Sequence, residues 1–262
     1  MPKPVPFVKA TACGNDFLLI ERKHARDADL MSWTRKICDR HCGVGADGVE
    51  WLSPGGEVDV AIHLLNADGS EAEISGNGTR CVAAWLADKT NKRELKIRTG
   101  AGLKTCTLIS QAGKSFEFRT AMGKPEVAGE ISLRLMKREV SGIAISMGNP
   151  HFVMFVDDFP KGWQAEAAEI GVHAHFPQGT NVELVKVIGF NSINIRIFER
   201  GAGETESSGT GSCASAVASI HSKRVKSPVK VVSPGGPQTV EWEDEVFLTG
   251  PAQILCGGEF YF

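Results

Sequence analysis

The sequence predicts an α/β (α+β) protein of two pseudo-symmetric domains, each a mostly antiparallel sheet wrapped around a central helix, with a ligand cleft between them. Two observations support this prediction. Short polar motifs recur once along the chain at a nearly constant interval, and two nearly apolar helices occupy corresponding places in the two halves. A single repetition after about 130 residues is typical of two fused domains rather than of a solenoid.

The recurring motifs keep both their order and their spacing. Each begins or ends in a glycine-rich loop, and the members of each pair lie 133 or 134 residues apart. The four pairs are Gly14 in GNDF with Gly148 in GNPH, Asp47 with Asn181, Asn66 with Glu199, and Ser75 with Ser208. The polar positions were therefore duplicated together with the scaffold, and equivalent loops are expected to face one ligand.

Two segments predict the central helices. Residues 79–88 and 212–220 are almost entirely apolar or small, and a helix that is apolar on all sides is buried. An amphipathic helix is predicted over residues 29–40, and strands are predicted in both arms of residues 7–20 and over residues 58–65, 95–99, 104–109 and 115–119. The glycine- and charge-rich stretch 122–138 sets the domain boundary, which gives domains 1–122, completed by a terminal strand 252–262, and 123–251.

Composition limits the classes of partner. The chain has 262 residues, 42% of them hydrophobic and 23% charged, and a net charge of −2, so no general attraction to nucleic acid or anionic membranes is expected. No apolar stretch reaches the roughly 20 residues of a membrane span, and the segment MPKPVPFVK lacks the apolar core of a signal peptide. We therefore expect a cytoplasmic protein with a small-molecule partner, and neither nucleic acid nor membrane.

Neither a disulfide framework nor a metal site is expected. The seven cysteines are odd in number and scattered, which favours reduced and mostly buried thiols. Cys38, His41 and Cys42 alone lie close together, and no second pair stands at a spacing that completes a zinc site.

The two central helices begin with the same kind of sequence, Ser-Gly-Asn-Gly from Ser75 and Ser-Gly-Thr-Gly from Ser208. A helix N-terminus offers unpaired N–H groups and the positive end of the helix dipole, so it can hold a carboxylate or phosphate. Two such ends can hold one small anion together. The alternative is that both serines are helix caps and nothing more.

Other site classes have weak support. The chain has no P-loop with its lysine, SGTGSCASA resembles a dinucleotide fingerprint only loosely, and the GxSxG elbow of serine hydrolases is absent. The asparagines beside these glycine-rich loops are turn formers when taken singly, but their repetition suits a ligand with several amino and carboxylate groups. No cofactor is expected.

GNDF, GVGADG, NADGSEA, GNGTRC, MGNPH, GTNV and ERGAGET, in this order along almost the whole chain, resemble the diaminopimelate epimerase family. The resemblance implies two pseudo-symmetric domains, each with a central helix, and a homodimer. It also implies epimerisation of LL-2,6-diaminopimelate to the meso form, in lysine and cell-wall synthesis, without metal or cofactor.

The resemblance also implies roles for individual residues. The substrate binders would be Asn15, Asn66, Asn149, Asn181 and Arg200, which read the distal end of the amino acid. Gly76, Asn77, Gly209 and Thr210 would hold the reacting α-carboxylate at the helix termini. His151 and Glu199 would adjust the protonation of the two catalytic groups.

Those catalytic groups depart from the family pattern. The family uses a pair of cysteines, and the matching positions here are Ser75 and Ser208. Three explanations stay open: an exchange of the cysteines made to trap an intact site, a natural branch with other proton carriers, or a ligand-binding relative without catalysis.

Two other activities are compatible with the sequence. The first is a different isomerase that works through Glu199, His151 or Glu73. The second is a racemase for another amino acid, which selectivity for the distal group would distinguish.

Overall fold

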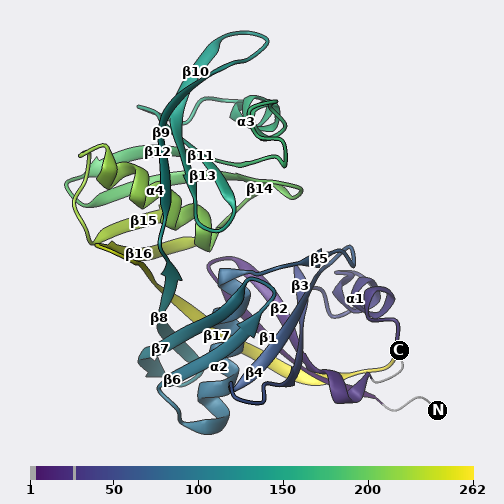
Figure 1. Ribbon diagram of the computed structural model, residues 1–262. Helices are drawn as coiled ribbons and strands as arrows, with labels where there is room; N and C mark the ends of the chain where they lie inside the picture. Colours follow the sequence, from purple (N-terminus) through teal and green to yellow (C-terminus); the bar gives the residue numbers. More distant parts are fainter. Residues whose placement is uncertain (1–3, 26–27) are drawn as a thin grey trace. The chain divides into compact units, whose positions relative to one another are not determined.

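The computed structural model describes residues 4–25 and 28–262 (Figure 1). The first three residues of the segment MPKPVPFVK lie outside this range. The chain forms two compact units: unit 1 comprises Met1–Thr120 and Gly250–Phe262, and unit 2 comprises Ala121–Thr249. Helices and a much larger number of mostly antiparallel strands build both units, which confirms the predicted fold class.

Unit 1 contains eight strands of its own, two α-helices and a 3-10 turn within the described residues. In chain order these are β1 (Val5–Ala12), β2 (Asn15–Glu21), η1 (Arg22–His24), α1 (Leu30–Cys38), β3 (Gly48–Pro54), β4 (Val60–Asn66), β5 (Glu71–Ala72), α2 (Gly76–Thr90), β6 (Glu94–Thr99), β7 (Gly102–Ala112) and β8 (Ser115–Gly123, the end of which passes into unit 2).

Helix α2 is the centre of unit 1 (Figure 1). Every residue from Asn77 to Ala87 is buried, and the apolar ones pack against β1, β2, β4, β6, β7 and β8. Ser75 caps the N-terminus, and Asn91 ends the helix in the left-handed conformation, with φ of 55°. The helix is three residues longer at its start than predicted, because Ser75 stabilises a glycine-rich first turn that reads as a loop.

The opposite face of the same strands is covered by α1. Alternation along β3 sends Trp51 to this side, where its indole N–H donates to Thr34 of α1 over 3.0 Å. Asp29 caps α1 through bonds from the backbone N–H groups of Met31 and Ser32. Strand β3 therefore separates two cores, with its even-numbered side chains directed toward α2.

Unit 2 repeats this order of elements. It contains β9 (Glu126–Arg134), β10 (Glu139–Ser146), β11 (Pro150–Phe155), α3 (Trp163–Gly171), β12 (Asn181–Gly189), β13 (Ser192–Glu199), β14 (Gly203–Thr205), α4 (Gly209–His221), β15 (Val229–Ser233), β16 (Gly236–Trp242) and the start of β17 (Val246–Phe260). Helix α4 is its buried centre, packed against β10, β11, β12, β13, β15 and β16.

The two parallel pairings in each unit show the duplication directly. Strand β2 pairs in parallel with β3 across α1, as β11 pairs with β12 across α3. Strand β4 pairs in parallel with β6 across α2, as β13 pairs with β15 across α4. The register of β2 and β11 makes Phe17 equivalent to His151 and Gly48 equivalent to Asn181, so the loop pair is displaced by one residue from the predicted Asp47–Asn181 match.

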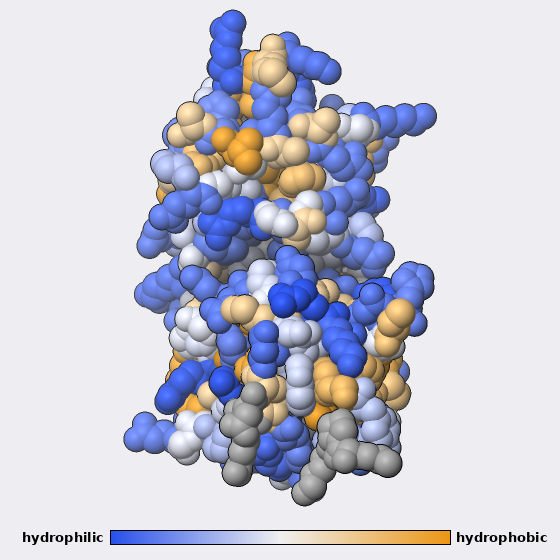
Figure 2. Space-filling model, turned by 90° about the vertical axis from the view of Figure 1, so that its right-hand side faces the viewer, coloured by the Kyte–Doolittle hydropathy of each residue, from blue (hydrophilic) through white to orange (hydrophobic). Residues whose placement is uncertain are grey.

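Strand β17 belongs to both units. Its first residues pair with β16, from Val246 to Thr249, and its later ones pair with β1, from Gln253 to Phe260. On the face shown in Figure 2 hydrophilic residues dominate and hydrophobic ones form separate small patches. Within residues 4–25 and 28–262, each helix is too short or too polar to span a lipid bilayer.

Candidate functional site

The N-terminus of α2 is closed by Ser75. Its hydroxyl oxygen accepts a bond from the backbone N–H of Gly78 over 3.0 Å, and its carbonyl accepts from the N–H of Thr79 over 2.8 Å. The side chain is half-buried, so it remains partly accessible to solvent. The capping role expected of this serine is thus present, and the adjoining N–H groups of the first turn include those of Gly76 and Asn77.

Ser208 has the same geometry at the N-terminus of α4. The N–H of Gly211 donates to its hydroxyl oxygen over 3.2 Å, and the N–H of Ser212 donates to its carbonyl over 2.9 Å. The hydroxyl also lies 3.5 Å from that of Thr210. Gly209 and Thr210 therefore occupy the positions in α4 that Gly76 and Asn77 occupy in α2.

In unit 1 a chain of hydrogen bonds fixes the amides beside Ser75. Asn15 donates to Asp47 over 3.1 Å, and the Asn77 amide donates to Asn15 over 2.6 Å. The guanidinium of Arg80, which is fully buried, donates to Asn77 in turn. The structure thus brings Asn15 and Asn77 together, whereas Asn66 lies exposed at the end of β4 and donates to Ser70.

Basic side chains hold Asp47, the residue at one end of this series of hydrogen bonds. Arg40 lies 2.8 Å from both Asp16 and Asp47, and Lys9 lies 2.9 Å from Asp16. Burial raises the pKa of Asp16, but hydrogen bonds from Arg40 and Lys9 outweigh it and hold that pKa below its ordinary value. Arg40 therefore fixes the Asp47 carboxylate, and this carboxylate orients the Asn15 amide by accepting its hydrogen bond.

In unit 2 the equivalent region contains a buried imidazole. His151 is 1% exposed; its Nδ1 lies 2.7 Å from the carboxylate of Glu183, and its Nε2 lies 3.1 Å from Oδ1 of Asn149. The imidazole is thus in contact with a polar side chain at each of its two nitrogens. The amide of Asn149 faces Thr210 over 3.5 Å. His151 is thus tied to the α4 N-terminus through Asn149.

Asn181 and Arg200 are also brought together. The Oδ1 of Asn181 accepts from the backbone N–H of Arg200 over 2.9 Å, while its amide donates to the carbonyl of Pro150. The exposed guanidinium of Arg200 donates to the carbonyl of Gln178 over 2.8 Å. Glu199 is the last residue of β13 and precedes Arg200. Among the described residues, the acidic side chain that contacts the His151 imidazole is that of Glu183 and not that of Glu199.

Sequence reasoning missed two buried carboxyl groups at these helix ends. Glu50 in β3 and Glu183 in β12 are both fully buried, and burial raises the pKa of each, that of Glu50 to about 8. They stand 133 residues apart, in VEWL and VELV, which is the interval of the other repeats. The signal was therefore present but is hidden inside apolar strand sequences.

Glycine in the first turn of each helix makes room for these carboxyl groups. A Cβ added at Gly78 would collide with Oε1 of Glu50, and one added at Gly211 would lie 2.8 Å from Oε1 of Glu183. Each of these positions is also next to the capping serine, at 3.2 Å from Cβ of Ser75 and 3.1 Å from Cβ of Ser208. In each unit a carboxyl group thus lies behind the helix end that the serine caps.

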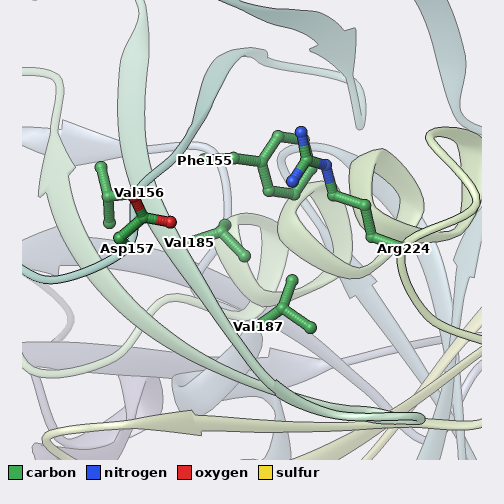
Figure 3. Close-up of a pocket in the computed structure, with 6 residues that line it drawn as sticks. All are labelled: Phe155, Val156, Asp157, Val185, Val187 and Arg224. Carbon is green, nitrogen blue, oxygen red and sulfur yellow. The ribbon is translucent and has the colours of Figure 1, made fainter.

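A separate pocket of about 300 Å³ lies in unit 2 (Figure 3). It is lined by Phe155, Val156, Asp157, Val185, Val187 and Arg224, and the Arg224 guanidinium packs 4.2 Å from the centre of the Phe155 ring. Phe155 ends β11 whereas His151 lies near its start, about 13 Å away at the usual rise per residue. None of the predicted site residues lines this pocket.

No group of three or more His, Cys, Asp or Glu side chains within the described ranges is arranged to hold a metal ion. Cys81 and Cys213 are buried inside α2 and α4. Burial raises the pKa of the Cys81 thiol above its ordinary value, which disfavours the thiolate there.

Comparison with known proteins gives one consistent assignment. The diaminopimelate epimerase family matches residues 7–128 and 143–255. Diaminopimelate epimerase of Agathobacter rectalis is 36% identical, with 97% of this chain and 98% of that protein covered, and that of Elusimicrobium minutum is 38% identical with the same coverage.

Solved structures show the same fold at low identity. A probable proline racemase from Agrobacterium radiobacter superposes with a TM-score of 0.74 at 15% identity, covering 98% of this chain and 93% of that one. A PhzF-family phenazine biosynthesis protein of Bacillus anthracis gives 0.75 at 13%, covering 99% and 100%. With family match, relatives and fold in agreement, the chain belongs to the diaminopimelate epimerase family of amino-acid epimerases and racemases.

Proposed function

We propose that this protein interconverts LL- and meso-2,6-diaminopimelate without a cofactor, by removing and replacing the proton on one α-carbon. One observation carries the proposal. Each unit holds a serine-capped helix N-terminus with hydrogen-bonded amide side chains beside it: Asn15 and Asn77 in unit 1, and Asn149 in unit 2. Family membership supports the substrate.

The binding roles follow from the chemistry of these groups. The first-turn N–H groups at Gly76, Asn77, Gly209 and Thr210 suit the reacting α-carboxylate, because helix N-termini favour anions. Arg200, with Asn15, Asn66, Asn149 and Asn181, suits the distal amino-acid end, since a guanidinium and several amides match a carboxylate and an ammonium group.

Proton transfer needs more than the two serines. A free thiol has a pKa of ~8.5, and the pKa of an alcohol lies far above it, a difference on the order of 10 kcal/mol in the free energy of deprotonation. A helix N-terminus contributes only about 1 to 2 kcal/mol, so Ser75 and Ser208 cannot be resting bases. In our proposal they pass protons while neighbouring groups hold the charge.

The test is exchange of the α-hydrogen. The protein is incubated with LL- and with meso-diaminopimelate in heavy water, and deuterium at the α-carbon is followed by mass spectrometry. We expect deuterium in both isomers and interconversion between them. Absence of both binding and exchange would reject the assignment.

The serines support one alternative, a diaminopimelate-binding protein without catalysis. In that case calorimetry would detect binding of the amino acid while no deuterium enters it. Restoring both thiols with Ser75→Cys and Ser208→Cys would then create exchange without a large change in affinity. We expect instead that the unchanged protein already exchanges.

Arg200 distinguishes diaminopimelate from a monocarboxylic amino acid as the substrate. We expect Arg200→Met to weaken diaminopimelate binding about 10- to 100-fold, the usual cost of losing a hydrogen bond to a charged group. Binding of an amino acid without a distal carboxylate should change little. Equal losses for both ligands would favour a racemase of different specificity.

A different isomerase that relies on Glu199, His151 or Glu73 makes another prediction. Its pH–rate profile would lose its governing ionisation in Glu199→Gln.

By analogy with the family we also propose a cytoplasmic homodimer that acts on a small amino acid, and analytical ultracentrifugation would test the dimer.

A further inference from the structure

Among the described residues of unit 1, Glu50 is the one buried carboxyl group, and the proposed function gives it no binding role. It has no exposed surface, and neither carboxyl oxygen has a hydrogen-bond partner within the described residues. An unsatisfied buried polar group destabilises a fold by about 1 to 3 kcal/mol, and an ionised one costs more. A carboxyl group that is buried at this cost in stability is expected to have a function.

The position of Glu50 is set by the pleat of β3. It pairs with Leu19 of β2 and Leu64 of β4, both of which face the core around α2. On that face its carboxyl group fills the space that a Gly78 side chain would take, and the same Cβ position lies 3.2 Å from Cβ of Ser75. The Glu50 carboxyl group thus extends from β3 toward the first turn of α2.

Few charged groups face this carboxyl. Helix α2 contributes Arg80, whose guanidinium binds Asn77, and Cys81, a buried thiol. Strand β2 carries Asp16 and Glu21, which pair with lysine or arginine side chains. On β4 the titratable His63 pairs with Glu71 of β5.

Further charged residues belong to elements that contact β3. They belong to α1, with Arg35 and Lys36, and to η1, with Arg22, Lys23 and His24. Burial is the cause of the raised pKa of Glu50, which lies close to neutral pH as a general base requires.

We propose that Glu50 is the proton acceptor behind Ser75, and that the pair replaces a catalytic thiolate in unit 1. This inference rests on the proposed function and deepens it. Glu50 acts through Ser75 and is therefore a positioning residue, whereas Ser75 touches the substrate.

The step balances as a relay of two protons. The substrate Cα–H bond breaks and its electron pair stays on carbon, stabilised by the adjacent carboxylate at the helix terminus. The released proton forms a bond to Oγ of Ser75, and the hydroxyl proton of Ser75 passes to Oε1 of Glu50. The Ser75 hydroxyl is not hydrogen-bonded to Glu50 in the structure, so this transfer requires a shift of one of the two side chains. The alcohol never carries a full negative charge, and the carboxylate becomes a neutral acid.

The second unit shows the same arrangement with one addition. Glu183 lies behind the Ser208 cap as Glu50 lies behind the Ser75 cap, but Glu183 has His151 as a partner. The residue of unit 1 that is equivalent to His151 is Phe17, an apolar residue that cannot share a proton. Glu50 is therefore left to hold a proton alone.

The closing experiment is a double-mutant cycle on the full chain. The rate of α-deuterium exchange from diaminopimelate is measured against pH for the wild type, Glu50→Gln, Ser75→Cys and the double variant. Glu57→Gln, an exposed glutamate of the same unit, is the matched control.

We expect the wild-type rate to rise as Glu50 ionises, at a pH above the ordinary range of glutamate. Glu50→Gln should lose more than tenfold in rate together with that ionisation. With Ser75→Cys the same change should cost less than about threefold, because a thiolate holds the charge itself. Equal losses in both backgrounds, or an unchanged pH profile in Glu50→Gln, would show a merely structural role and overturn the proposal.

A second pair of variants covers the case in which Glu50→Gln folds poorly. Ser75→Ala leaves the carboxyl group in place and should reduce exchange as much as Glu50→Gln does. Combining the two should cost no more than either alone, since they interrupt one relay. Additive losses would contradict the relay.

Failure of the relay is distinguishable from failure of the proposed function. If the wild type exchanges no deuterium while Ser75→Cys combined with Ser208→Cys does, the substrate assignment stands and the relay is wrong. If none of these proteins binds diaminopimelate, the proposed function itself is wrong.

Discussion

At the scale of single residues, the candidate site consists of side chains fixed by other side chains. Asn15 and Asn77 are oriented by Asp47 on one side and Arg80 on the other, and His151 is fixed between Glu183 and Asn149. Amides held in this way lose little conformational entropy when a ligand binds. This order suits a site that distinguishes stereoisomers of one amino acid.

Replacement of Glu50 by glutamine should stabilise the fold at alkaline pH. The folded-state pKa of Glu50 lies near 8, above its unfolded value, so the folded state binds more protons between those values. Stability therefore falls as pH rises from about 4.5 to 8, by ~1.4 kcal/mol for each pH unit in that interval, and Glu50→Gln lacks this loss.

Chemical denaturation at pH 5 and at pH 8.5 measures this difference. We expect the advantage of Glu50→Gln over the wild type to grow between the two pH values and to level off above them. Glu57→Gln, at an exposed position, should show no such growth. A pH-independent difference would mean that Glu50 is ionised in neither state or in both.

At the scale of elements, the glycines of the two helix starts carry a packing requirement. Gly78 and Gly211 have ordinary helical dihedral angles and are there because a buried glutamate occupies the space beside each. The motifs Gly-Asn-Gly and Gly-Thr-Gly thus combine two properties, a free first-turn N–H group and room for a carboxyl group behind it.

Gly78→Ala tests this requirement. A Cβ there would collide with Oε1 of Glu50, and we expect a loss of about 1 to 3 kcal/mol in unfolding free energy, typical of overpacking. Gly171→Ala at the end of α3 is the matched control, since its Cβ would meet only the Thr180 carbonyl at 3.5 Å, and a change below about 1 kcal/mol is expected. Combining Gly78→Ala with Glu50→Ala should recover part of the loss.

Elements also show where sequence patterns were insufficient. Helix α3 was not predicted, because it follows a left-handed Gly162 and has no side-chain cap, so no start signal marks it. Strand β9 was expected to be part of a glycine- and charge-rich boundary. Its side chains alternate between exposed and half-buried at the edge of β10, which provides too little apolar periodicity to predict a strand.

At the scale of the whole molecule, β17 makes each unit depend on the C-terminal segment. Its residues up to Thr249 complete the sheet of unit 2, and those from Gln253 onward cover β1 in unit 1. Beyond the strand, Phe262 stacks on Trp33 of α1 with ring centres 3.7 Å apart. The chain end therefore closes the unit in which the chain begins.

Ending the chain after Gly250 should destabilise unit 1 selectively. Strand β1 would lose β17 as a partner along seven residue pairs and keep only β2, while the pairing of β16 with β17 would remain. Hydrogen exchange followed by mass spectrometry should show protection lost in β1, β2 and α2 and retained in β12, β13 and α4. Removing only Tyr261 and Phe262 is the control, and uniform loss of protection after the larger truncation would contradict the prediction.

The duplication, the two buried helices, the serine caps and the identity of the family could all be predicted from the amino-acid sequence. These features are local or periodic: a cap spans three residues, apolar character on all sides of a helix is visible in its composition, and a repeat keeps its interval. The substrate-binding roles stay a prediction, because they were inferred from the motifs alone.

The folded structure is needed to see which polar groups are in contact and which buried ones have no partner among the described residues. His151 and Glu183 are 32 residues apart in sequence and Asn15 and Asn77 are 62 apart, so no spacing rule joins them. Whether Glu50 faces the α2 core or the α1 core depends on the pleat of β3 and its register with β2, and a shift of one residue would reverse it. Burial without a partner is a property of that surrounding core, which a linear sequence does not display.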